Sequence, residues 1–165
     1  MEKQAGNIKT KKIILWILII LWMTVIFLFS AQDSDESSRL SRGFLRNFIL
    51  WFLPDSLSAD TVDVLEYILR KCAHMTEYAI LGILISIQIR LYHLFESDWK
   101  KICAAAGLVM LYAATDEIHQ LFVGGRSGQF TDVLIDTFGG IAGILIIYLI
   151  WKLRASRKSE NGGKL

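Results

Sequence analysis

The sequence lacks a strong charge of either sign, because its 18 basic and 16 acidic residues give a formal net charge of only +2. Nucleic-acid binding, which depends on a concentrated basic surface, therefore has no support. The chain also lacks an internal repeat, a low-complexity tract and a Walker-type glycine loop, so repeat architectures and P-loop nucleotide binding are excluded. Its two cysteines, Cys72 and Cys103, fall at opposite ends of predicted membrane spans, too far apart for a disulfide.

Apolar residues dominate what is present. Hydrophobic residues make up 53% of the chain, with one proline and a mean hydropathy of +0.43, which is typical of a membrane protein. The sequence predicts an all-α, polytopic membrane domain with a core at about 13–151 and four transmembrane helices, at about 13–31, 73–92, 102–121 and 133–151. The first apolar run is longer than that of a signal peptide, so we interpret it as an uncleaved anchor.

Basic residues indicate the orientation of these spans. Twelve of the 18 lie before the first span, between the second and third, or in the tail of residues 152–165, whereas twelve of the 16 acids lie elsewhere. With four spans these three regions share one side of the membrane. By the positive-inside rule that side is the cytoplasm, so we expect a multi-pass protein of the bacterial plasma membrane with both termini and the basic tail cytoplasmic.

The longest predicted outer segment joins the first two spans. Within it, residues 39–53 alternate arginines with apolar residues at spacings of three and four, which is the pattern of an amphipathic helix in the membrane interface. The same pattern fits a lid packed over the bundle. Pro54 ends this helix, and either Ser58 or Asp60 is a candidate cap for the next one.

Polar residues at membrane depth collect at the outer ends of the second, third and fourth spans. A charged residue at mid-membrane costs roughly 3 kcal/mol on insertion scales, so a cluster of them needs an explanation. Any one of them could be a buried structural pair. Because the whole set lies on one side, we expect one site, formed by Lys71, His74, Glu77, Tyr78, Asp116, Glu117, His119, Gln120, Arg126, Asp132 and Asp136.

Two chemistries fit these residue types. Histidine with carboxylates suits acid–base catalysis or a divalent metal, and the candidate metal ligands are His74, Glu77, Asp116 and His119. No HExxH motif is present, no nucleophile stands out, and nothing in the sequence requires a cofactor. Alternatively, Lys71 and Arg126 can hold a phosphate or carboxylate, helped by backbone N–H groups of the Gly124–Gly125 turn.

Three ordered motifs resemble the VanZ-like family of membrane proteins. They are KxxHxxxYxxLG from Lys71, DExxQxFxxGR from Asp116, and DxxxDxxG from Asp132. The resemblance covers about residues 13–150, although this chain has Gly124 where the family often has proline. It implies a cell-envelope role and a link to low-level resistance to the glycopeptide teicoplanin, without supplying a reaction.

We therefore expect a cell-envelope protein that recognises or modifies a lipid-linked or glycopeptide-like headgroup at its outer face. Its expected partners are membrane lipids, and its expected ligand is a lipid-linked cell-wall precursor or a lipoglycopeptide. We expect no nucleic-acid partner, and a homo-oligomer is compatible with the sequence. The alternative is a membrane-embedded metal- or histidine-dependent hydrolase of lipid or polyprenyl phosphates. A small transporter has less support, because no obvious polar pathway lines the inner half of the predicted bundle.

Overall fold

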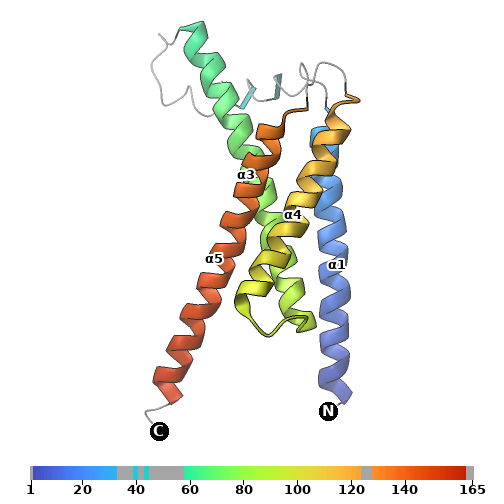
Figure 1. Ribbon diagram of the computed structural model, residues 1–165, viewed down its shortest axis with the longest axis vertical. Coiled ribbons are helices and arrows are strands. Elements are labelled where there is room, and N and C mark those ends of the chain that lie inside the picture. The colour runs from blue at the N-terminus through green and yellow to red at the C-terminus, as the bar shows by residue number, and fades with distance from the viewer. Residues whose placement is uncertain (1, 33–38, 41–42, 45–57, 124–127, 163–165) are drawn as a thin grey trace.

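The fold was analysed in a computed structural model, which describes residues 2–32, 39–40, 43–44, 58–123 and 128–162. Within these ranges it contains four long helices and no strand, namely α1 (Glu2–Ser30), α3 (Ala59–Tyr92), α4 (Asp98–Gln120) and α5 (Phe130–Gly162) (Figure 1). All four are long and apolar enough to cross a membrane, which confirms the predicted all-α, four-span architecture. Of the predicted interfacial helix at 39–53, only residues 39–40 and 43–44 are described, so this helix stays a prediction.

Helix α3 begins well before the apolar run that it carries. The side chain of Ser58 accepts a hydrogen bond from the Thr61 backbone N–H at 3.3 Å, so one of the two predicted caps starts the helix. With 34 residues, the helix is about 51 Å long, more than the roughly 30 Å of a hydrocarbon core. Its first turns therefore project beyond the other helices (Figure 1).

The bundle has two distinct ends. Both chain termini and the short connection between α3 and α4 lie at one end, which we call the proximal end (Figure 1). The opposite, distal end holds the end of α1, the end of α4 and the start of α5. This arrangement agrees with the even number of spans expected from the distribution of basic residues.

Helix α3 is the centre of the bundle, because it packs against α1, α4 and α5, and its contact with α5 is the most extensive. Glycines make that contact possible. A Cβ atom at Gly139 would overlap the backbone of Met75, and one at Gly143 would overlap the backbone of Ala79. Gly139 and Gly143 thus form the small-xxx-small pair that their spacing predicts, and the two helix backbones touch directly.

Large apolar side chains point mostly outward, as expected for helices surrounded by lipid. On α1, for example, Ile13, Ile17 and Leu21 are each about 60% exposed. The buried core is small and central, and its fully enclosed members include Tyr78, Leu81, Val109 and Ile144. The association of these helices consequently depends on close backbone packing and on interhelical polar contacts.

Candidate functional site

A small polar cavity lies near the distal end, between α3, α4 and α5. Its volume is about 10 Å³, which is room for no more than one water molecule. The sequence places its polar walls at helical spacings of three and four, so each helix directs two side chains to one face. The cavity is lined by Ile135 and by six of the predicted site residues, namely Lys71, His74, Glu117, Gln120, Asp132 and Asp136.

Lys71 and Asp132 close the cavity with an ion pair between α3 and α5. The Lys71 Nζ atom lies 2.5 Å from Asp132 Oδ1, and each side chain is 22% exposed. The lysine also lies over the ring of Tyr67, with 5.3 Å between Nζ and the ring centroid. Lys71 is therefore engaged by a carboxylate within the protein, whereas the sequence suggested that it holds an external anion.

Glu117 connects α4 to the chain that leads into α5. Its Oε1 atom accepts a hydrogen bond of 2.5 Å from the backbone N–H of Gln129. Glu117 is only 6% exposed, so this bond compensates part of the cost of removing a carboxylate from water. The contact also fixes the start of α5 (Phe130–Gly162) and hence the position of Asp132 and Asp136.

A second polar layer lies deeper in the bundle and is centred on Asp116. The Tyr78 hydroxyl, on a side chain with no exposed surface, donates to Asp116 Oδ2 at 3.3 Å. Ser30 at the end of α1 and Gln120 on α4 are buried close enough to interact with the same carboxylate. All four helices therefore contribute to this end of the bundle.

The remaining predicted residues have different surroundings. Glu77 lies beside His74, with 3.7 Å between His74 Nδ1 and Glu77 Oε2. His119 instead stacks on Phe27 of α1, with ring centroids 4.3 Å apart. Arg126 lies outside the described residues, so its predicted place in the site and its role in holding an anion stay predictions.

The candidate metal ligands are spread over separate contacts. His74 and Glu77 face each other, Asp116 binds the Tyr78 hydroxyl, and His119 stacks on α1. Across the described part of the chain, no group of three or more histidine, cysteine, aspartate or glutamate side chains is placed to hold a metal ion. The chemistry that the geometry offers is therefore hydrogen bonding and charge recognition by carboxylates, lysine and imidazole.

Sequence analysis did not single out three residues that support this end of the bundle. Ser30 lies against Asp116, the Gln129 backbone binds Glu117, and Trp22 Nε1 donates to the Glu77 carbonyl at 2.9 Å. In the sequence, Ser30 is only a serine at the end of the first apolar run, and Trp22 is only a tryptophan inside it. Neither position by itself indicates a role near the polar cluster. Gln129 acts through its backbone, which no side-chain pattern reveals.

Of three comparisons with known proteins, one gives a match. No curated protein and no solved structure matches the chain. The model of the VanZ/LLP1 family matches residues 15–151, a range that includes the polar cavity and the layer around Asp116. The chain is therefore a VanZ-like membrane protein, a member of the VanZ/LLP1 family.

Proposed function

We propose that this protein acts in the bacterial cell envelope by recognising the polar headgroup of a lipid-linked or glycopeptide-like molecule at the distal end of its bundle. The convergence of six polar side chains from three helices on one cavity carries this proposal. Polar pairs that only hold the helices together could lie at either end of the bundle. Each polar side chain at membrane depth costs free energy, so the collection of these groups at one end favours a ligand site. Placing the distal end outside follows from the positive-inside rule.

The charge of the cavity favours a headgroup rich in hydrogen-bond donors. Its described lining holds three carboxylates, Glu117, Asp132 and Asp136, against one lysine, which Asp132 already binds. Carboxylates accept hydrogen bonds from hydroxyl, amide N–H and ammonium groups. Sugar and peptide headgroups present these donors, whereas a bare phosphate presents only acceptors and would be repelled.

Recognition takes place at the rim, because the cavity itself has room for no more than one water molecule. The side chains of Lys71 and Asp132 are each 22% exposed, and that of His74 is 21% exposed. An arriving headgroup thus meets the Lys71–Asp132 pair first. A ligand ammonium or hydroxyl group can replace Lys71 at Asp132 and reach the buried carboxylates behind it.

The test uses teicoplanin as the probe in a susceptible bacterium that expresses the chain. We expect the parent protein to raise the minimum inhibitory concentration, and Glu117→Gln or Asp136→Asn to remove that protection at unchanged membrane levels. Glu117→Gln keeps an acceptor for the Gln129 N–H and replaces the other carboxylate oxygen by an uncharged NH2 donor. The matched control is Glu96→Gln, an exposed carboxylate in the proximal connection. Equal protection by the parent and both cavity variants would refute the proposal, as would the absence of protection by the parent.

A second assay separates recognition from the hydrolase alternative. Purified protein is incubated with a polyprenyl phosphate, and free phosphate is measured for the parent and for His74→Ala. The recognition proposal predicts no release above a protein-free blank from either protein. If the parent releases phosphate and His74→Ala does not, the protein is a hydrolase and the recognition proposal is wrong.

A further inference from the structure

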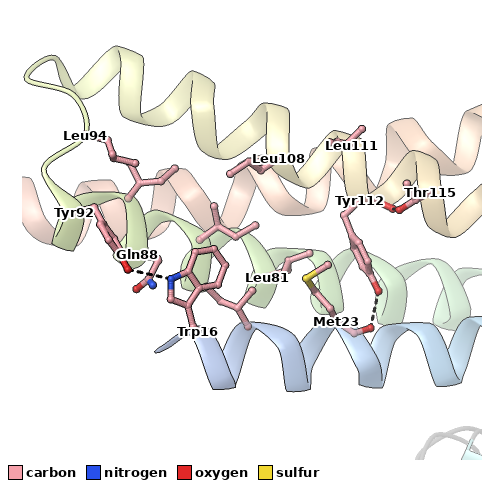
Figure 2. A pocket seen from close by; sticks show the side chains of 13 residues that line it. Trp16, Met23, Leu81, Gln88, Tyr92, Leu94, Leu108, Leu111, Tyr112 and Thr115 are labelled. Atoms are coloured by element: carbon pink, nitrogen blue, oxygen red, sulfur yellow. Dashed lines mark hydrogen bonds between the residues drawn. The ribbon is translucent and has the colours of Figure 1, made fainter. Parts of the chain in front are cut away.

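A large apolar groove separates α1 from α4, at a distance from the polar cavity. Its volume is about 670 Å³, within the range of small-molecule binding sites. Helix α3 forms its floor with Leu81, Ile85 and Ile89, and α4 contributes Leu108 and Leu111 to its wall. Figure 2 shows the side chains of α1, α3 and α4 turned toward this space. No described segment of the chain fills it.

Three polar side chains of the wall donate hydrogen bonds within the protein. Trp16 Nε1 donates to the Tyr92 hydroxyl at 3.2 Å, and Gln88 Nε2 donates to the Lys12 carbonyl at 3.2 Å (Figure 2 shows the first). At the other end, the Tyr112 hydroxyl donates to the Met23 carbonyl at 2.6 Å. With these donors occupied, the groove offers apolar contact, which suits a hydrocarbon chain and excludes a polar solute.

The length of the groove matches one half of a bilayer. On α3 its lining runs from Leu81 to Tyr92, which corresponds to about 16 Å at 1.5 Å per residue. Half of a hydrocarbon core of roughly 30 Å is about 15 Å. Because α3 ends at Tyr92, this stretch of the lining lies in the leaflet at the proximal end, and Tyr112 and Thr115 of α4 continue the lining toward the distal end.

Charge at the proximal mouth of the groove indicates the headgroup. Lys12 Nζ lies over the Tyr92 ring, 4.2 Å from its centroid, and Tyr92 itself lines the groove. Trp16 and Tyr92 are aromatic residues of the kind that lie at the level of the headgroups. Lys9, Lys11 and Lys100 add positive charge at this end, which attracts anionic lipid, whereas Lys101 pairs with Asp98 at 3.0 Å.

We propose that the groove holds one acyl chain of an anionic phospholipid from the leaflet at the proximal end, with the lipid phosphate close to Lys12. In a membrane, lipid chains surround the bundle, and the mostly apolar wall suits a hydrocarbon chain because the donors of Trp16, Gln88 and Tyr112 are already bonded within the protein. The groove shares no lining residue with the polar cavity. This lipid site is therefore separate from the proposed headgroup site and does not depend on it.

The experiment is native mass spectrometry of the intact protein in mild detergent with added phosphatidylglycerol or phosphatidylcholine. Leu108→Trp with Leu111→Trp fills the groove, and Leu145→Trp with Leu149→Trp is the matched control on lipid-facing positions of α5, since all four leucines are about half or more exposed. We expect the parent and the control to retain one phosphatidylglycerol each. The groove variant should bind it at least about tenfold more weakly, with unchanged helicity by circular dichroism. Lys12→Gln should remove the preference for phosphatidylglycerol over phosphatidylcholine.

Three results would overturn the lipid site. The first is a parent protein that retains no lipid, as expected if another segment of the chain filled the groove. The second is a groove variant that retains lipid as well as the α5 control does. The third is a lipid-free dimer of the parent that the groove variant fails to form, which would make a second copy the occupant. Equal retention of phosphatidylglycerol and phosphatidylcholine by the parent would refute the proposed preference for an anionic headgroup.

Discussion

The packing of α3 on α5 predicts opposite effects for the same substitution at two glycines. Gly143 faces α3, and a Cβ atom built there lies 2.7 Å from the carbonyl carbon of Ala79, closer than real Cβ contacts allow. Gly107, inside α4, has nothing within 4 Å of the corresponding position. Gly143→Ala should therefore destabilise the protein, and Gly107→Ala should leave it unchanged or stabilise it.

The expected magnitudes follow from two opposing effects. Alanine is favoured over glycine inside a helix by about 1 kcal/mol, a gain that both variants share. Overpacking a close contact costs about 1–3 kcal/mol, and only Gly143→Ala incurs this cost. The overlapping atoms of Ala79 belong to the backbone, so no side-chain rotation relieves them and the cost should lie in the upper part of that range. The two variants should differ by about 2–3 kcal/mol in the free energy of unfolding.

The assay is unfolding of the purified protein in dodecyl maltoside by increasing fractions of sodium dodecyl sulfate, followed by circular dichroism. A further variant, Ala79→Gly in the Gly143→Ala background, tests the cause. It should give no rescue, because the overlap is with the Ala79 backbone and not with its methyl group. Rescue by Ala79→Gly, or equal stability of Gly143→Ala and Gly107→Ala, would show that α3 and α5 do not touch as described.

Three further predictions concern the polar end and the topology. Glu117→Ala should lower stability by about 1–3 kcal/mol in the same assay, because the Gln129 N–H loses its acceptor, whereas Glu117→Gln should recover much of this loss; equal effects of the two variants would contradict the hydrogen bond. Tyr78→Phe should cost about 1 kcal/mol through loss of the buried hydroxyl donor, while Tyr67→Phe, which alters an exposed ring, should be neutral. In a chain without native cysteines, a cysteine at position 37 should react with an impermeant thiol reagent added to intact cells, and one at position 98 should not; labelling at position 98 would reverse the orientation.

Sequence alone was sufficient for the architecture and the family. Apolar runs of spanning length and the positions of lysine and arginine predicted four helices, and the motifs that begin at Lys71, Asp116 and Asp132 indicated the VanZ-like family. These properties depend on local composition and order along the chain. A run of about twenty apolar residues must form a helix in lipid, whatever its neighbours are, because its backbone groups have no other partners there.

The partners within the polar cluster were beyond sequence reasoning. Lys71 had several carboxylates within reach at the same depth, and only the rotation of α5 against α3 assigns it to Asp132. Likewise, His119 and Gln120 are neighbours in sequence, yet the imidazole stacks on Phe27 while Gln120 lines the cavity. Helical spacing fixes which residues share a face, but not which neighbouring helix that face meets.

The sequence by itself thus determined the number of spans, their order and the depth at which the polar residues lie, because hydrophobicity and helix geometry act along a single segment. The tertiary structure alone decided how the helices are rotated about their axes. Direct contact of the α3 and α5 backbones at Gly139 and Gly143 sets one rotation and brings Lys71 to Asp132. The sparse contact between α1 and α4 leaves the apolar groove, a space created by how three helices fit together and therefore invisible in any one of them.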